Sequence, residues 1–207
     1  MKIFFEEYVY KWDVVKEFLH GDLLRDGTVR IAIPLHSFHR SLHTQGLYLR
    51  FQDVCNGYEP VETEEINENG RHKVELIPLK ENPKLDMLEE VIEDIGNKQV
   101  IVWCSRSRLL YDAEARIREK GYTTAIYDGK IGHEEREKGY KSFNEGRTQV
   151  IFINQASGGY GLDGLKEADY AVYLCNSYSV EQRLQSEGRN YRGVITRSKY
   201  YIDIQYD

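Results

Sequence analysis

From Pro83 onward, apolar strand patterns alternate with amphipathic helix patterns, and this alternation constrains the fold more than any other feature. The predicted strands cover residues 99–104, 148–154, 170–175 and 199–205, and a further strand with the turn after it covers residues 123–129. The predicted helices cover residues 84–95, 108–121, 133–146 and 180–192. The first of these strands carries a continuous apolar run, which is typical of a strand covered on both faces. Strands that alternate with helices over short loops form a parallel sheet. The sequence therefore predicts an α/β domain over residues 83–207, with a parallel sheet flanked by helices on both faces.

Residues 1–82 follow a less regular pattern and are expected to form a separate N-terminal segment. The pattern indicates a short strand over residues 28–34 and a helix within residues 36–58, with Gly57 as its stop signal. Two β-rich runs flank residues 67–70, which end in Asn-Gly, a strong hairpin signal. We therefore expect a strand, a helix and a β-hairpin before the α/β domain begins.

The charge balance excludes one class of nucleic-acid-binding protein. The chain has 34 acidic and 28 basic residues and a formal net charge of −6. It therefore cannot bind nucleic acid through bulk positive charge, as histone-like proteins do. A local basic face on an acidic protein remains compatible with this balance.

The sequence also indicates the compartment. It contains no run of about twenty apolar residues, so we expect no membrane span. The N-terminus carries acidic residues where a signal peptide needs a clean apolar stretch. Cys55, Cys104 and Cys175 are scattered among apolar neighbours, which is typical of buried, reduced thiols. These features predict an intracellular, cytoplasmic protein.

In a parallel sheet of this kind, the functional loops leave the carboxyl ends of the strands. Here those loops cover residues 105–107, 127–130, 154–162 and 176–178. Residues 159–164 satisfy the G-x-G-x-x-G pattern of dinucleotide binding, but the first glycine lies five residues beyond the strand and the next strand ends without an acid for a ribose. Two other interpretations stay open: a loop that needs small residues to turn tightly, and a nest of backbone N–H groups that faces a phosphate.

The segment QSEGRNYR at residues 185–192 is the second candidate site. On a helix, Gln185, Arg189 and Arg192 lie at positions i, i+4 and i+7, on one face. Two arginines and an amide on one stripe can bind a polyphosphate with forked donors. The alternative is a solvated charged face, which is what most charged runs are.

Other site patterns are weaker or absent. His36, His39 and His43 share one helical face, so a zinc or nickel site is possible in principle, but no cysteine or clustered acid accompanies them and we predict no metal site. The G-x-x-x-x-G-K-[ST] loop that holds ATP and magnesium is missing, since Gly129-Lys130 is followed by Ile131. No Asp-Glu-x-x box follows an apolar strand.

Six segments, taken in order, resemble the second RecA-like lobe of superfamily 2 helicases, in particular the Swi/Snf-type DNA translocases and their phage relatives. These segments are LYLRFQDVCNGY (47–58), NPKLDMLEEVIEDI (82–95), VIVWCSRSR (100–108), YDGKIGHEEREKGYKSFNEG (127–146), ASGGYGLDGLKEAD (156–169) and QSEGRNYR (185–192). The third, fifth and sixth resemble helicase motifs IV, V and VI. Gly129, Arg136 and Phe143 match the turn, arginine and phenylalanine that follow motif IV in the family.

The resemblance implies a RecA-like fold in which ATP lies in a cleft between two lobes. By this resemblance, Arg189 and Arg192 match the two arginines of motif VI and are the catalytic candidates that stabilise charge on the transferring phosphoryl group. Gln185 and Asp163 would be neighbours of the ATP cleft, and Asp163 stands where the family usually has asparagine. The candidate nucleic-acid-binding residues come from motif V and the neighbouring strand ends: Ser157, Gly158, Gly159, Gly161, Ser105, Arg106, Gly129 and Lys130.

The resemblance therefore predicts the second motor lobe of an ATP-dependent helicase or translocase, with DNA as the expected nucleic acid, in a bacterial or phage-infected cell. ATP and Mg²⁺ would bind only together with an N-terminal RecA-like lobe, and the chain alone, which lacks the P-loop lysine, is expected not to hydrolyse ATP. Three alternatives stay open: a stand-alone RecA-like module that binds nucleic acid or protein without ATP turnover, a Rossmann-type nucleotide-binding enzyme, and a structural fragment.

Overall fold

The structure is a computed structural model of the 207-residue chain, and it describes residues 22–23, 29–30, 49–68, 70, 72–158, 162, 165–177, 179–190 and 198–205. The chain divides into two compact units, one of residues 1–82 with Asp207 and one of residues 83–206. None of the described helices combines the length and the apolar character that crossing a membrane requires.

The first elements that the structure describes in the first unit are two short antiparallel strands. Strand β1 (Asp22–Leu23) pairs with β2 (Val29–Arg30). Strand β2 lies within the strand predicted over residues 28–34, and the remaining residues of that prediction lie outside the described part of the chain. The three histidines of the possible metal site, His36, His39 and His43, also lie outside it.

The longest strands that the structure describes in the first unit form a β-hairpin. A helical stretch over residues 49–55 leads into β3 (Tyr58–Ile66), which pairs antiparallel with β4 (His72–Pro78). In this register Tyr58 lies opposite Pro78. The hairpin predicted from the Asn-Gly signal is therefore confirmed.

Gly57 lies at the junction between the helical stretch and the hairpin. Its φ is +88°, a left-handed conformation that side chains rarely adopt, and a Cβ at this position would lie 2.3 Å from Nδ2 of Asn82. That amide instead donates a hydrogen bond of 2.8 Å to the carbonyl of Asn56. Only glycine fits this turn, so the helix ends before it, as predicted. The helix predicted within residues 36–58 is thus described only over 49–55.

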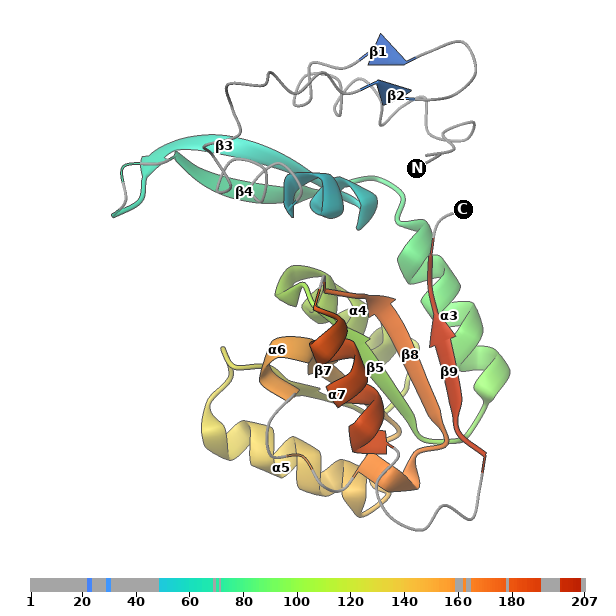
Figure 1. Ribbon diagram of the computed structural model, residues 1–207. Coiled ribbons are helices and arrows are strands. Elements are labelled where there is room, and N and C mark those ends of the chain that lie inside the picture. The colour runs from blue at the N-terminus through green and yellow to red at the C-terminus, as the bar shows by residue number, and fades with distance from the viewer. Residues whose placement is uncertain are drawn as a thin grey trace. The chain divides into compact units, whose positions relative to one another are not determined.

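The second unit contains a five-stranded parallel sheet in the order β6-β7-β5-β8-β9 (Figure 1). Its strands are β5 (Val100–Cys104), β6 (Thr124–Tyr127), β7 (Val150–Asn154), β8 (Tyr170–Cys175) and β9 (Tyr200–Asp203). Its helices are α3 (Pro83–Ile95), α4 (Ser107–Glu119), α5 (His133–Asn144), α6 (Gln155–Gly158) and α7 (Val180–Asn190), with a 3₁₀ turn η2 (Leu165–Glu167). The predicted α/β class with a parallel sheet is confirmed.

Helices cover both faces of this sheet. The chain crosses from β5 to β6 in one direction and then from β6 to β7, β8 and β9 in the other. Since parallel crossovers are right-handed, opposite directions place the connecting helices on opposite faces, with α4 on one face and α5, α6 and α7 on the other. Phe143 of α5 accordingly packs in one buried cluster with alternate strand residues such as Trp103 and Ile153.

One element differs in kind from the prediction. Residues 155–158 form the helical turn α6, where the sequence predicts a loop. The side-chain Oδ1 of Asn154 accepts a hydrogen bond of 3.0 Å from the backbone N–H of Ala156, which caps this turn. The last two residues of the helix predicted over 180–192 lie outside the described residues, and the final strand β9 is shorter than predicted.

Helix α3 offers a matched pair for testing the packing. Leu88 is fully buried, whereas its neighbour Met87 is 47% exposed. Leu88→Ala should lower the free energy of unfolding by about 2–5 kcal/mol, because it removes buried methyl groups and leaves a cavity. Met87→Ala should change it by no more than about 0.5 kcal/mol. Urea denaturation of both variants measures the difference, and equal losses would contradict the packing of α3.

Candidate functional site

The carboxyl ends of the parallel strands bring several of the predicted site residues to one edge of the sheet. Ser105 and Arg106 follow β5, Gly129 and Lys130 follow β6, and α6 with Ser157 follows β7. Helix α7 leaves the same edge after β8. Loops at this edge are where open parallel sheets bind their ligands.

Gly129 and Ser157 are in direct contact. The backbone N–H of Gly129 donates a hydrogen bond of 2.8 Å to Oγ of Ser157. A Cβ at position 129 would lie only 3.1 Å from that oxygen, so glycine allows the close approach. Lys130, next to this contact, is exposed. The structure thus brings together two predicted phosphate-binding segments that are far apart in sequence.

Ser105 and Arg106 lie on the same edge but not beside this contact. Strand β7 separates β5 from β6 in the sheet, so the two pairs follow strands that are not neighbours. The backbone N–H of Ser105 donates to the carbonyl of Cys175 at 2.9 Å, and its Oγ lies 3.3 Å from the Cys175 Sγ. Ser105 therefore joins the ends of β5 and β8, and Arg106 stands at the start of α4.

Helix α7 carries Gln185 and Arg189 one turn apart, as the sequence predicts. The side chain of Gln185 donates a hydrogen bond of 2.9 Å to Oε1 of Glu181. Arg189 is only 9% exposed. The alternative interpretation of this stripe, a charged face in contact with solvent, therefore does not hold at Arg189. Arg192, Asp163, Gly159 and Gly161 lie outside the described residues, and Gly158 is the last residue of α6.

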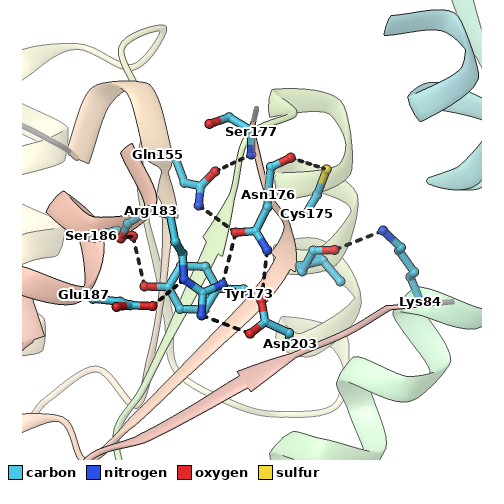
Figure 2. A network of polar contacts seen from close by, with 11 residues as sticks. Lys84, Gln155, Tyr173, Cys175, Asn176, Ser177, Arg183, Ser186, Glu187 and Asp203 are labelled. Atoms are coloured by element: carbon cyan, nitrogen blue, oxygen red, sulfur yellow. Dashed lines mark hydrogen bonds and ion pairs between the residues drawn. The ribbon is translucent and has the colours of Figure 1, made fainter. Parts of the chain in front are cut away.

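Arg183 is the residue of this edge that the sequence reasoning missed (Figure 2). Its guanidinium group forms a two-pronged ion pair with Asp203 of β9, with Nη2 2.9 Å from Oδ2. Its Nε donates to Oε1 of Glu187 at 2.6 Å, and the guanidinium lies 3.4 Å from the ring centre of Tyr173. The sequence offered one sign of these contacts, the spacing of four residues between Arg183 and Glu187 on a predicted helix. The contacts with Asp203 and Tyr173 could not be read from the sequence, because those residues lie on separate strands.

Tyr173 of β8 contacts two residues of α7, Arg183 through its ring and Ser186 through its hydroxyl group. Ser186 Oγ donates a hydrogen bond of 2.7 Å to the backbone carbonyl of Arg183. Since that hydroxyl has a single proton, the Tyr173 hydroxyl is the donor in its 2.9 Å contact with Ser186 Oγ. Burial raises the pKa of Tyr173 well above its ordinary value, although the charge of Arg183 opposes this rise. The hydroxyl therefore stays protonated and keeps donating to α7.

The ion pair shifts the pKa of both partners. Burial on its own would raise the pKa of Asp203, but the hydrogen bonds from Arg183 and Asn176, together with the charge of Arg183, outweigh it and the pKa lies below its ordinary value. Burial likewise disfavours the charged form of Arg183, and the hydrogen bonds to Asp203 and Glu187 reverse this and raise its pKa. Both groups stay charged at neutral pH.

The thiols fit the predicted buried state in two of three cases. Cys104 and Cys175 are buried and unpaired by disulfides, whereas Cys55 is only half-buried. Burial raises the pKa of the Cys104 thiol well above its ordinary value, and the neighbouring Cys175 thiol raises it further. Within the described residues, no group of three or more His, Cys, Asp or Glu side chains is placed to hold a metal ion.

Comparison with known proteins identifies the second unit. The family model of the helicase conserved C-terminal domain matches residues 83–194. Among curated proteins, the zebrafish (Danio rerio) chromodomain-helicase-DNA-binding protein 1-like is 25% identical over 146 residues, which are 70% of this chain and 13% of that protein. The human (Homo sapiens) SWI/SNF-related matrix-associated actin-dependent regulator of chromatin subfamily A member 1 is 27% identical over 110 residues, 52% of this chain and 10% of that protein. The chain thus spans only a small part of these relatives.

Solved structures show the same fold at low sequence identity. The C-terminal part of the Fun30 ATPase domain has a TM-score of 0.53 and 17% identity, over 59% of this chain and 41% of that chain. The C-terminal domain of the DEAD-box protein Dbp5 also has a TM-score of 0.53 and 17% identity, over 60% of this chain and 70% of that chain. The RecA-like architecture of a C-terminal helicase lobe is therefore confirmed.

The lowered pKa of Asp203 gives a test that does not depend on these relatives. Because its pKa is lower in the folded chain than in the unfolded chain, its ionised form stabilises the fold above the unfolded pKa, and this stabilisation is lost as pH falls through the folded pKa. Asp203→Asn should lower the free energy of unfolding at pH 7 and flatten its decline between about pH 5 and pH 2. Urea denaturation across this range measures both effects.

Asp94→Asn, on the exposed side of α3, is the control for removing one surface carboxylate. If the Asp203 variant matched this control in both the value at pH 7 and the slope, the ion pair with Arg183 would not stabilise the chain.

Proposed function

Because the chain belongs to the family of helicase conserved C-terminal domains, we propose that it is the second motor lobe of an ATP-dependent helicase or translocase that acts on DNA. The observation that carries this proposal is the reach of the family match, which extends over residues 83–194. That range includes the loops at the carboxyl edge of the sheet and the whole of α7. The similarity to Swi/Snf-type relatives favours DNA over RNA.

We assign the ATP side of the lobe to α7. Arg189 and Arg192 would donate hydrogen bonds to the transferring phosphoryl group, where charge grows in the transition state. The position of both arginines in the segment that resembles motif VI, within the matched range 83–194, supports this role. Gln185, on the same stripe of the helix, and Asp163 would line the same cleft.

We assign the nucleic-acid side to the turns that follow β5, β6 and β7. The contact between Gly129 and Ser157 supports this assignment, because it places a backbone turn, an exposed lysine at position 130 and a hydroxyl together. Such groups bind phosphates and carry little sequence information. The full set that we propose is Ser105, Arg106, Gly129, Lys130, Ser157, Gly158, Gly159 and Gly161.

ATP and Mg²⁺ would bind between this lobe and a first RecA-like lobe, which is the partner we propose. The arginines of α7 fit the γ-phosphate of a nucleotide, since forked guanidinium donors match phosphate oxygens. Because the sequence contains neither the G-x-x-x-x-G-K-[ST] loop nor an Asp-Glu-x-x box after an apolar strand, we place the Mg²⁺ ligands and the P-loop lysine on the first lobe. When bound, Mg²⁺ would neutralise phosphate charge, and this chain would supply the opposing arginines.

Arg192 gives the sharpest test, in a two-lobe protein that joins this chain to its first lobe. Arg192→Ala and Arg192→Lys should each reduce DNA-stimulated ATP turnover by about a thousandfold. The affinity for ATP should fall much less, because the arginine acts on charge that grows in the transition state. Lysine should fail as a substitute because it lacks the planar fork. Turnover is measured as phosphate release at saturating DNA.

The matched control is Arg108→Ala, which removes an arginine from an exposed ion pair with Asp112 on α4. Turnover of both Arg192 variants within a few-fold of this control would remove Arg192 from the catalytic site.

Lys130 tests the nucleic-acid side in the 207-residue chain itself. Binding of the chain to a DNA duplex should be weak and salt-sensitive, since few phosphate contacts oppose the negative charge of the protein. Lys130→Ala should weaken binding equally for different sequences and reduce the slope of log K against log salt by about one. A fluorescence titration at several salt concentrations measures this slope.

Lys141→Ala is the matched control, because Lys141 is a 76% exposed lysine in the last turn of α5, at the opposite end of the sheet. An identical slope for the wild-type chain and both variants would exclude Lys130 from the interface.

A further inference from the structure

Asn176 joins Arg183 to the turn that follows β7. Its Oδ1 accepts hydrogen bonds from Nη1 of Arg183 at 3.3 Å and from Nε2 of Gln155 at 3.1 Å. Its Nδ2 donates to Oδ1 of Asp203 at 2.9 Å. Both lone pairs of the amide oxygen and one amide proton are therefore used, and this fixes the orientation of the side chain between two elements (Figure 2).

Gln155 carries the connection into α6. It is only 1% exposed, and its Oε1 accepts a hydrogen bond of 2.9 Å from the backbone N–H of Ser177. Gln155 is the first residue of α6, and Ser157 in the same turn accepts the hydrogen bond from Gly129. A continuous series of hydrogen bonds and one helical turn therefore runs from Gly129 to Arg183 on α7.

We propose that Arg183, through Asn176 and Gln155, is a positioning residue that couples the turn containing Ser157 to the helix α7. What the two ends bind, phosphate of DNA at one and ATP at the other, rests on the proposed function, but the coupling is a property of the described residues. A shift of α6 would move Gln155 and, through their hydrogen bond, Asn176. Asn176 also accepts a hydrogen bond from the guanidinium of Arg183, whose ion pairs fix α7. Arg189 lies six residues beyond Arg183, which is roughly 9 Å along the helix.

If Arg183 only fixed α7 to the sheet, its hydrogen bond to Asn176 would not be needed. The two-pronged pair with Asp203 and the bond to Glu187 already fix the guanidinium and neutralise its charge. The bond to Asn176 adds nothing to the charge balance, yet it connects this pair to a different loop. Lysine could keep the charge of Arg183 but not all of these directions at once, because it lacks the planar fork of donors.

Amide hydrogen exchange on the 207-residue chain tests the coupling without any ligand. Arg183→Ala and Arg183→Lys should each speed exchange by about fivefold or more at α7 and also at the Ser177 and Gly129 amides, which report on Gln155 and Ser157. Asn176→Ala leaves the ion pairs of Arg183 in place, so it should speed exchange at Ser177, Gly129 and the last turn of α7 without unfolding the helix. The amides of β5 and β7 report whether the fold is kept.

Arg108→Ala is the matched control, since it also breaks a helical arginine–carboxylate pair four residues apart. It should leave all of these amides unchanged. The coupling is overturned if the Arg183 variants affect only α7, or if Asn176→Ala leaves either α7 or Gly129 at the wild-type rate. If Arg183→Ala unfolds the chain, the Asn176 variant alone decides between these outcomes.

A second arm adds a saturating DNA duplex. In the wild-type chain, DNA should slow exchange in the last turn of α7, and in Asn176→Ala it should still bind but lose this remote effect. Equal slowing in both chains would overturn the coupling. If the wild-type chain does not bind DNA at all, the proposed function fails, and the ligand-free arm still decides whether Arg183 couples the two elements.

Discussion

Strand β5 is buried along its whole length, and the arrangement of the lobe follows from this burial. Its neighbours β7 and β8 pair with it in parallel on either side, so its backbone hydrogen bonds are satisfied within the sheet. A strand without an exposed side chain needs helices on both faces, and right-handed crossovers supply them only if the chain reverses its direction across the sheet. Because the strands are parallel, the turns after β5, β6, β7 and β8 lie at one edge, where Ser105, Arg106, Gly129, Lys130 and Ser157 are found.

The polar contacts at this edge centre on the charged guanidinium of Arg183, whose partial burial would be unfavourable without partners. Arg183 lies partly inside the protein, where its charge is compensated by the carboxylates of Asp203 and Glu187. The contacts that stabilise its charge also fix α7 against β8 and β9, and through Asn176 against α6. In our account, the requirement to satisfy one guanidinium thus aligns the nucleotide side of the lobe with its nucleic-acid side.

The sequence was a good guide to the elements and a partial guide to the site. The apolar run of β5, the hairpin and the helix stop at Gly57 each follow from local patterns, and the structure confirms them. The helical turn α6 was missed, because it depends on the side chain of Asn154 capping the turn. The pairing of Arg183 with Asp203 could not be predicted, since the two residues are brought together only by the position of β9 beside β8. The roles of Arg189, Arg192, Asp163 and the glycines after α6 stay predictions.

The most direct test of the central claim, that this chain is one half of a two-lobe motor, is ATP turnover measured for the chain alone, the first lobe alone and both joined, each with and without DNA. Phosphoryl transfer needs a P-loop lysine and Mg²⁺ ligands on one side of the nucleotide and arginines on the other, so neither lobe should suffice by itself. DNA-dependent turnover is expected only when both lobes are present. Turnover by the isolated 207-residue chain that persists after repurification, or turnover by the first lobe that this chain does not increase, would contradict this claim.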